Sequence, residues 1–455
     1  MTDTAIAGSD AAQAAARRIE ERKVLAGTVV GTTIEWYDFF IYAQAAGAVF
    51  ATLYFAPAGE TVGQIVSWAS LGISFLFRPL GAIVAGHLGD RLGRKRMLVL
   101  TLIMMGLATA LIGVLPTYAQ IGIAAPVLLI LLRVLQGFSA GGEWGGAALM
   151  SVEHAPKHRR GFFGAYPQIG VPLGMILATA TMWVITTTLT EEQFLTWGWR
   201  IPFLFSIVLI VVGYFIRKTV EESPVFKQLQ ERKGESATPL KTLFSKHARE
   251  VILAALIFIA NNAAGYLLIA FFSTYATRPV ADGGLGLERP PVLLATTLAS
   301  FGWLFFTLYG GILSDRIGRV RTFQIGYVLL GIWAIPMWFL IDTGNLWLYF
   351  LALFLMTVGL GLSYGPQASL YAEMFPADVR YSGVSIGYAI GAIFGGAFAP
   401  MIADLVFGAT GASWTIGLYI LGVTIISLIA VSLVKEPKGV NLHTRSNEVV
   451  VPEEA

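Results

Sequence analysis

Twelve long apolar runs, separated by segments in which charged residues cluster, dominate the chain of 455 residues. Each run can form a helix that crosses a bilayer, because about 20 residues rising about 1.5 Å each cover a hydrocarbon core of about 30 Å. The runs lack the alternation that a membrane β-barrel strand shows over about ten residues. Lipid offers no partner to backbone polar groups, so the pattern predicts an all-α membrane protein with twelve transmembrane helices. The runs lie near residues 24–54, 62–88, 97–115, 122–148, 161–188, 200–217, 250–276, 292–314, 322–341, 346–371, 381–407 and 413–434.

The composition agrees with a lipid environment and the charge distribution predicts an orientation. Apolar residues make up 56% of the chain, charged residues 13%, and mean hydropathy is +0.69, far from the values of a soluble domain. The first 23 residues contain no apolar signal-peptide core. Of 31 basic residues, three lie in or beside the loops expected outside (Arg200, Arg278, Arg289) and two lie within runs (Arg78, Arg133). The positive-inside rule therefore places both termini in the cytoplasm, and we expect a multi-pass protein of the bacterial cytoplasmic (inner) membrane. The net charge of +3 then reflects orientation rather than nucleic-acid binding.

Several chemistries have no support in the sequence. Without cysteine, disulfides and thiolate metal sites are excluded. The sequence has no cluster of histidines and carboxylates with metal spacing, no nucleophile elbow, no catalytic triad pattern and no phosphate-binding loop. We therefore expect no enzyme activity, no metal, no cofactor and no direct use of ATP.

Two motifs occur twice. GHLGDRLGRKR at 86–96 and GILSDRIGRVR at 311–321 share seven of eleven residues, and an E-x-x-P-x-x-x-R spacing begins at both Glu153 and Glu373. Two matched motifs at similar offsets indicate a duplicated half, a common design among transporters. We therefore predict two pseudo-symmetric six-helix bundles. The expected domains are a cytoplasmic tail (1–23), the first bundle (24–218), a charged cytoplasmic linker (219–249), the second bundle (250–434) and a second cytoplasmic tail (435–455).

These motifs resemble those of the major facilitator superfamily. The resemblance rests on the repeated G-x-L-x-D-R-x-G-R phrase, on LLRVLQGFSAGGEWGG around Arg133, and on the E-x-x-P-x-x-x-R repeats. TTIEWYDFFIYA, FLFRPLGA and WGWRIPFLFS are similar to the metabolite:proton symporter family within it, which includes shikimate, α-ketoglutarate and proline/betaine permeases. The resemblance implies a central cavity, alternating access by rocking, and a latch between the bundles formed by Asp90, Arg91 and Arg94. The fifth run reads GAYPQIGVPLG and lacks the Gly-Pro pattern of many drug antiporters, which favours symport.

The first run contains two carboxylates where hydrocarbon makes charge costly. Glu35 and Asp38 lie three residues apart, and Tyr42 shares their helical face. Two close carboxylates cannot both ionise cheaply at low dielectric, so one of them is expected to take up and release a coupling proton. The alternative is that they are static partners of Arg78 or Arg133.

Arg133 is the candidate cation for a substrate carboxylate, because a guanidinium stays charged and donates two parallel hydrogen bonds. Gln136 and Glu143 extend a polar stripe along the fourth run. A structural ion pair with the first run is the alternative.

The second half offers neutral candidates for the substrate site. Amides and phenols can orient a polar solute or, alternatively, bond helix to helix. The candidates are Asn261, Asn262 and Tyr266 on the seventh run and Tyr364, Gln367 and Tyr371 on the tenth. Tyr166 and Gln168 on the fifth run are weaker candidates.

Charged residues at the expected cytoplasmic ends of the helices are candidate gating residues. They can pair with one another or with helix ends, and such a network can bias a conformational balance. The alternative is that their positive charge only holds the loops inside. Besides Asp90, Arg91 and Arg94, the candidates are Glu153, Arg160, Asp315, Arg316, Arg319, Glu373 and Arg380.

The sequence thus predicts a monomeric, proton-coupled symporter that imports a small organic acid, such as a shikimate-like compound or a dicarboxylate. One alternative is a proton-coupled carrier of zwitterionic osmolytes such as proline and betaine, although the short tail after Lys435 lacks the sustained heptads of some osmosensing carriers. The other alternative is a membrane sensor that does not transport.

Overall fold

The computed structural model describes residues 2–92, 94–219, 239–377 and 379–442, with side chains from residue 21 onward except those of 60, 86–97, 217, 219 and 239. Over these ranges the regular elements are helices, including three π-helical segments (η1, η5 and η7). The first half contains α1 (Thr2–Ala45), η1 (Ala46–Phe50), α2 (Ala51–Tyr54), η2 (Ala56–Ala58), α3 (Glu60–Leu92), α4 (Arg94–Val114), α5 (Tyr118–Ile121), α6 (Ala124–Ala140), α7 (Glu143–Glu153), η3 (Lys157–Arg159), α8 (Arg160–Thr188), α9 (Glu191–Thr196), η4 (Gly198–Arg200) and α10 (Ile201–Thr219).

The second half repeats this pattern of long helices joined by short ones. It contains α12 (Pro239–Lys246), α13 (Ala248–Tyr266), η5 (Leu267–Phe271), α14 (Phe272–Thr277), η6 (Val280–Asp282), α15 (Arg289–Ile317), α16 (Arg319–Trp333), α17 (Pro336–Ile341), α18 (Leu346–Tyr364), α19 (Gln367–Met374), α20 (Arg380–Ala392), η7 (Ile393–Ala397), α21 (Ala399–Thr410) and α22 (Trp414–Ser432).

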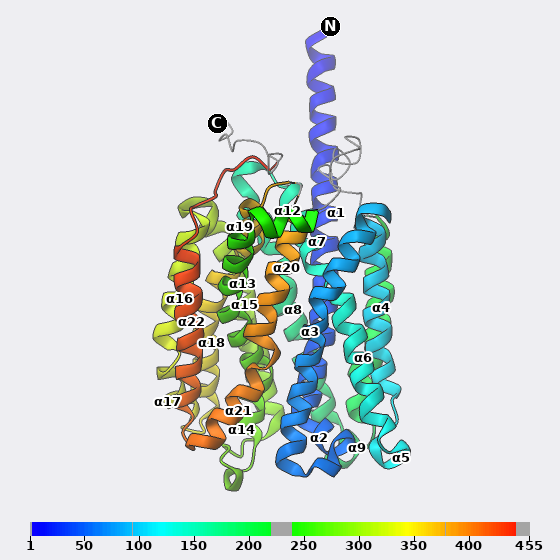
Figure 1. Ribbon diagram of the computed structural model, residues 1–455, viewed down its shortest axis with the longest axis vertical. Coiled ribbons are helices and arrows are strands. Elements are labelled where there is room, and N and C mark those ends of the chain that lie inside the picture. The colour runs from blue at the N-terminus through cyan, green and yellow to red at the C-terminus, as the bar shows by residue number, and fades with distance from the viewer. Residues whose placement is uncertain (1, 93, 220–238, 378, 443–455) are drawn as a thin grey trace.

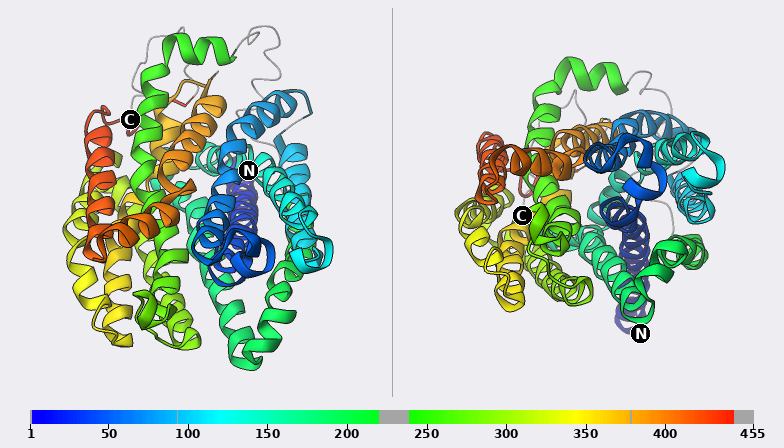
Figure 2. Two further views of the ribbon diagram at one scale, coloured as in Figure 1. Left: turned by 60° about the horizontal axis from the view of Figure 1, so that its bottom comes forward. Right: turned by 90° about the horizontal axis from the view of Figure 1, so that it is seen from below.

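The helices form two groups that lie side by side, the first half running from blue through cyan to bluish green and the second from green to red (Figures 1 and 2). The two ends of the described chain lie at the same end of the molecule, here called the termini end, and α1 projects beyond the other helices there (Figure 1). Across the contact between the groups, α8 packs against α15, and α3 packs against α20 and η7. These five elements therefore form much of the contact between the two groups.

Within the described ranges, nine helices are long and apolar enough to cross a membrane. The three other expected spans correspond to α1 with η1 and α2, to α4, and to α16 with α17. The first carries two carboxylates, and the last is interrupted just before Pro336. Large apolar side chains such as Phe215, Phe305 and Phe339 are more than 60% exposed, as expected for a surface that contacts lipid.

Several expected helices are interrupted, and the interruptions match between the halves. The fourth span breaks at Gly141–Gly142, between α6 and α7, and the tenth breaks at Gly365–Pro366, between α18 and α19. The π-helical segments η1 and η5 likewise occupy equivalent places in the first and seventh spans. The pattern of apolar residues predicts where a helix lies, but it does not reveal an extra residue in one turn. The sequence analysis therefore predicted neither the two breaks nor the π-helical segments.

The glycines of the fourth span allow α6 to approach α3 very closely. A Cβ atom at Gly137 would lie 1.8 Å from the carbonyl oxygen of Ser74, and one at Gly141 would lie 2.0 Å from that of Arg78. No side chain fits there, and glycines four residues apart are what such a close approach of two membrane helices requires. This approach brings the polar residues of α3 within reach of Arg133.

Candidate functional site

The two carboxylates of α1 have different partners rather than a shared site. Both side chains are fully buried. Glu35 Oε1 lies 3.8 Å from Arg78 Nη2 on α3. Asp38 accepts hydrogen bonds from Thr109 Oγ1 on α4 at 2.8 Å and from Ser206 Oγ on α10 at 2.6 Å. Asp38 is thus held inside the first group of helices.

Arg133 is buried on α6 and holds α3. Its Nη2 donates to the carbonyl oxygen of Leu71 at 3.1 Å and to Ser74 Oγ at 2.7 Å. Its guanidinium lies over the Tyr42 ring, 3.8 Å from the centroid. The Tyr42 hydroxyl is 2.7 Å from Ser70 Oγ, so this tyrosine serves as a platform for the arginine. Tyr42 does not line either of the pockets described below.

A relay of hydrogen bonds connects Arg133 with Asp38. Arg133 Nη1 donates to Gln136 Oε1 at 2.7 Å, and Gln136 Nε2 donates to Thr109 Oγ1 at 2.6 Å. Thr109 Oγ1 in turn donates to Asp38. The cation and the carboxylate that the sequence singled out are therefore coupled through two neutral side chains.

Arg78 lies under a set of aromatic rings. Its guanidinium carbon is 4.4 Å from the Phe39 centroid, 4.5 Å from that of Phe75 and 5.6 Å from that of Trp36. Phe75 and Trp36 also pack against Tyr266 of the second half, at 5.2 and 6.1 Å between centroids. The Glu35–Arg78 pair therefore lies one aromatic layer from the contact between the halves.

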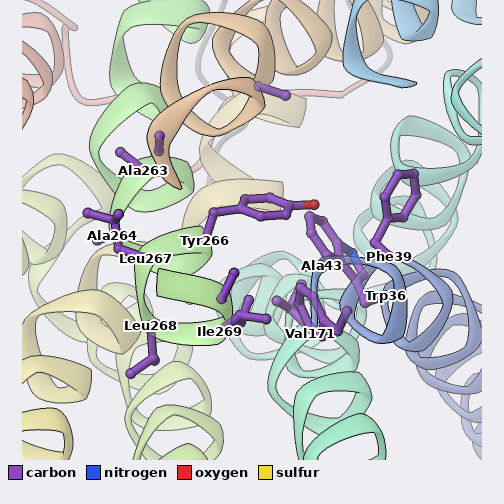
Figure 3. Close-up of a cluster of buried hydrophobic side chains, with 14 of the residues drawn as sticks. Trp36, Phe39, Ala43, Val171, Ala263, Ala264, Tyr266, Leu267, Leu268 and Ile269 are labelled. Atoms are coloured by element: carbon purple, nitrogen blue, oxygen red, sulfur yellow. The ribbon is translucent and has the colours of Figure 1, made fainter. Parts of the chain in front are cut away.

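A small pocket, here called the inner pocket, lies at that contact. Both halves line it, and Figure 3 shows the Tyr266 ring extending from α13 toward Trp36 and Phe39 of α1. Four of the predicted binding residues line it, and aromatic rings make up much of its remaining wall. Those four are Asn261, Asn262, Tyr266 and Tyr364, and the rings include Trp36, Phe40, Phe258 and Trp303.

The asparagines are partly engaged between helices. Asn261 donates to the Tyr327 hydroxyl at 3.1 Å and accepts from Ser363 Oγ at 2.9 Å, while Asn262 donates to the carbonyl of Ala392 at 3.1 Å. The Tyr266 hydroxyl is buried and has no hydrogen-bond partner among the described residues. Tyr266 thus has hydrogen-bonding capacity to spare in the inner pocket, as do the indole N–H groups of Trp36 and Trp303.

Gln367 and Tyr371 do not line the inner pocket. Tyr371 donates to the carbonyl of Ala254, which joins α19 to α13. Gln367 Oε1 is 3.5 Å from Nε2 of Gln168, a residue of α8. The contacts of both candidates therefore join one helix to another, which is the alternative role that the sequence analysis gave them.

Polar and aromatic contacts close the space between the inner pocket and the termini end. Trp144 of α7 stacks on Tyr388 of α20 at 3.8 Å between centroids. The Trp144 indole donates to Gln168 Oε1 at 2.8 Å, and Gln168 Nε2 donates to the carbonyl of Tyr364 at 3.2 Å. These residues form a plug that links the two halves.

At the termini end the repeated motifs pair crosswise. Arg380 Nη1 lies 3.6 Å from Glu153 Oε1, and Arg160 Nη1 lies 3.8 Å from Glu373 Oε1. Each glutamate of one E-x-x-P-x-x-x-R copy therefore faces the arginine of the other copy. The sequence analysis named all four residues as gating candidates, but it did not predict that each glutamate would pair with the arginine of the other motif.

Asp315 of the second repeated phrase caps a helix of the first half. Its carboxylate accepts from the backbone N–H groups of Gly161 and Phe162, both at 2.8 Å, at the start of α8. Arg319 donates to Asp315 at 2.7 Å and to both oxygens of Glu373 at 3.1 and 3.2 Å. Burial lowers the pKa of Arg319, but Glu373 and Asp315 offset this and raise the pKa above its ordinary value. Arg319 thus stays charged at any physiological pH.

The segment after α22 lies across this cluster (Figure 1). The Glu436 carboxylate accepts from the first two backbone N–H groups of α16, both at 3.0 Å. Arg160 donates to the carbonyl of Val440 and Arg380 to that of Leu442, both at 2.7 Å. The sequence offers no motif by which to recognise this segment. Its contacts with the arginines are made by backbone carbonyls, which every residue type has.

The remaining gating predictions divide into two groups. Arg316 is exposed and contributes its backbone carbonyl to Lys438 Nζ at 3.2 Å. The side chains of Asp90, Arg91 and Arg94 lie outside the described residues, so the latch implied for the first copy stays a prediction.

Two groups of helices with pockets between them, buried ionisable residues and a lipid-facing surface define a membrane transporter. The model of the Major Facilitator Superfamily matches residues 28–383 and 294–451. The chain belongs to this superfamily, whose members are transporters rather than enzymes.

Three curated relatives illustrate its range. The chain is 40% identical to the inner membrane metabolite transport protein YhjE of Escherichia coli, over 92% of this chain and 95% of that protein. It is 36% identical to the shikimate transporter of Escherichia coli (91% and 94%) and 33% identical to a proline/betaine transporter of Salmonella typhimurium (91% and 83%). The predicted resemblance to metabolite permeases of this superfamily is therefore confirmed.

Solved structures agree on the fold. The proton:xylose symporter XylE bound to 6-bromo-6-deoxy-D-glucose superimposes with a TM-score of 0.73, covering 94% of this chain and 98% of that chain. At 16% sequence identity this similarity shows the fold alone. The predicted fold class is confirmed. The domain limits, the orientation and the roles of the site residues stay predictions.

Proposed function

We propose that the protein is a proton-coupled symporter of the bacterial inner membrane that imports a small organic acid, with the termini end in the cytoplasm. The relay from Asp38 to Arg133 carries this proposal, because it couples a buried carboxylate to a buried cation that grips α3. Buried carboxylates in membrane helices are costly and are characteristic of proton pathways.

The relay connects the protonation of Asp38 to a movement of α3. As a carboxylate, Asp38 accepts from Thr109 and Ser206; once protonated, it loses negative charge and those bonds weaken. The change passes through Thr109 and Gln136 to Arg133, which holds α3. Because α3 packs against α20 of the other half, a shift of α3 alters the contact between the halves. The Glu35–Arg78 pair, one aromatic layer from the inner pocket, is the second candidate for the proton.

The bonds at the termini end suit a state that is closed toward the cytoplasm. Crosswise ion pairs, the Asp315 cap and the plug all join the two halves there. We propose that they part when the bundles rock and the solute leaves on the cytoplasmic side. Alternating access requires that such contacts exchange between two states of similar free energy.

A carrier of zwitterionic osmolytes is the second candidate. The inner pocket is lined by aromatic rings and amides without a charged side chain, a surface that also suits a quaternary ammonium group. Proline/betaine transporters are among the relatives. A sensor that does not transport has no observation of this kind in its favour.

Uptake by purified protein in liposomes, with pH and voltage imposed separately, tests the proposal. Shikimate, 2-oxoglutarate, proline and glycine betaine form the panel. A monoanion taken up with one proton is electroneutral and follows the pH gradient alone, whereas a zwitterion with one proton also follows voltage, about 2.3 kcal/mol per 100 mV. Accumulation of an organic acid under a pH gradient supports the proposal. If no panel member accumulates under a pH gradient, organic-acid symport is wrong.

A further inference from the structure

A second pocket, here called the outer pocket, lies between the halves on the side away from the termini end. Gln44 and Met182 of the first half and Thr277 and Arg289 of the second line it. Ile269 lines both this pocket and the inner pocket, so the two pockets are adjacent.

Both of the matched π-helical segments contribute to the outer pocket. Gly47 and Ala48 belong to η1, and Ile269 and Ala270 belong to η5. A π-helical turn inserts one residue into a helix, re-aims the side chains that follow, and occurs often at functional sites. Each half thus contributes a π-helical segment to the wall of the outer pocket.

Gln44 is a buried polar group that lacks a partner. Its side chain is 8% exposed, and neither amide atom has a hydrogen-bond partner among the described residues. Leaving a buried amide unsatisfied costs about 1–3 kcal/mol, so an unpartnered amide of this kind calls for a partner such as a ligand, a water or an ion. Gln44 lines the outer pocket, where it can donate to an acceptor.

Arg289 supplies the pocket's positive charge and is the charged residue of its lining. Its guanidinium lies 5.7 Å from the centroid of Phe194. Glu191 is the carboxylate within electrostatic reach, but it is exposed and forms no ion pair with Arg289 within 4.0 Å in the described part of the chain. A guanidinium that is not already bound to a carboxylate can present two parallel N–H donors to a ligand.

We propose that the outer pocket is a binding site for the carboxylate group of the transported solute, held by Arg289 and Gln44 before the solute passes Ile269 into the inner pocket. This site rests on the proposed function, since it assigns a first stop to the same solute. The inner pocket, which has no charged lining residue, then receives the rest of the molecule. Organic acids and betaines both carry a carboxylate, so the site would serve either candidate substrate.

Protection of a single cysteine from labelling tests this site directly. The chain has no native cysteine, so Thr277→Cys introduces the only thiol into the wall of the outer pocket. The protein is reconstituted in nanodiscs, and the rate of its reaction with a maleimide is measured with shikimate, with glycine betaine and with the methyl ester of each. At ten times the dissociation constant, a bound acid should slow labelling about tenfold, and its ester should not.

Variants in the Thr277→Cys background locate the donors. Arg289→Gln and Gln44→Leu should each abolish protection, and Arg289→Lys should retain part of it. Arg200→Gln is the matched control, because Arg200 lies at the same end but donates to the backbone carbonyls of Gly113 and Leu115. It should leave protection unchanged. Size-exclusion profiles check folding, and should Arg289→Gln aggregate, Gln44→Leu carries the test.

The proposal is overturned if neither acid protects, if the esters protect equally, or if protection survives both Arg289→Gln and Gln44→Leu. These outcomes are separate from those of the uptake experiment, which does not depend on the thiol. Protection without uptake under a pH gradient would refute organic-acid symport and leave the outer site standing. Uptake of an organic acid without protection would support organic-acid symport and refute the carboxylate site in the outer pocket.

Discussion

Arg133 and Asp38 are coupled over a distance by Gln136 and Thr109, each of which both donates and accepts a hydrogen bond in the relay. The arginine therefore responds to the charge of Asp38 through two neutral side chains. A relay of this kind is sensitive to every member, since the loss of one bond leaves the neighbouring polar groups buried and unsatisfied.

Thr109→Val should weaken coupling without removing either charged group. Valine keeps the shape of threonine but removes the hydroxyl that links Gln136 to Asp38. The lost bond to a charged group is worth about 1.5–3 kcal/mol, which corresponds to a fall of roughly tenfold or more in uphill accumulation. Uptake in liposomes under a pH gradient measures this. Thr109→Ser keeps the hydroxyl and should behave like the wild type; equal loss in both variants would count against the relay.

Asp38→Asn should abolish uphill accumulation while exchange across the membrane survives. The amide cannot take up and release a proton, but it still fits between Thr109 and Ser206. A pH difference of one unit supplies about 1.4 kcal/mol, so the tenfold accumulation that it supports should be lost. Counterflow of labelled solute measures exchange separately. Glu35→Gln is the parallel test, and normal accumulation by both variants would refute a proton role for either carboxylate.

Neutralising the crosswise pairs should open the termini end. Glu153→Gln with Glu373→Gln removes a charge from each pair, a change of order 1–3 kcal/mol, which shifts the balance of states about 5- to 150-fold. Ser385→Cys, buried where α20 faces α7, reports opening as faster labelling. Asp404→Asn is the control, since it breaks the Arg278–Asp404 pair within the second half. Unchanged Ser385→Cys labelling in the double variant would show that the pairs do not hold this end closed.

Gly137→Ala should destabilise the protein through the contact of α6 with α3. The added Cβ would lie 1.8 Å from the Ser74 carbonyl oxygen, which forces the helices apart at a cost of about 1–3 kcal/mol or more. Thermal unfolding in detergent should show a lower midpoint. Gly422→Ala, with no atom within 4 Å of its Cβ, should be neutral or raise stability by about 0.4–1 kcal/mol. If the two alanine variants unfold at the same temperature, the close approach does not limit stability.

The sequence predicted the architecture well because hydrocarbon leaves few choices. Apolar runs of sufficient length had to be helices, and the duplicated motifs indicated two halves. The breaks at Gly141–Gly142 and Gly365–Pro366 were not predicted. They depend on how a glycine or proline is packed, and the apolar pattern used to locate the spans does not record that.

The sequence predicted which residues are candidates for the site, but not which of them contact one another. Asn261, Asn262, Tyr266 and Tyr364 line the inner pocket, but Gln367 and Tyr371, which the spacing placed on the same face as Tyr364, do not. The helix breaks at Gly365–Pro366, so a spacing counted along one continuous helix does not hold across it. The partners of Asp38 come from α4 and α10, and no local spacing encodes a serine and a threonine so far along the chain. Gln44 was overlooked because a lone amide within an apolar run carries no motif.

The reciprocity of Glu153 with Arg380 and of Arg160 with Glu373 has a consequence for the origin of the chain. Contacts in which residue i of one copy meets residue j of the other, and j meets i, are those of an isologous interface about a twofold axis. A half-length ancestor that assembled as a homodimer would have made the same two bridges from one pair of residues. Gene fusion would then have preserved the interface while freeing each copy to diverge, which is how Asp38 and Arg133 could arise in one half alone.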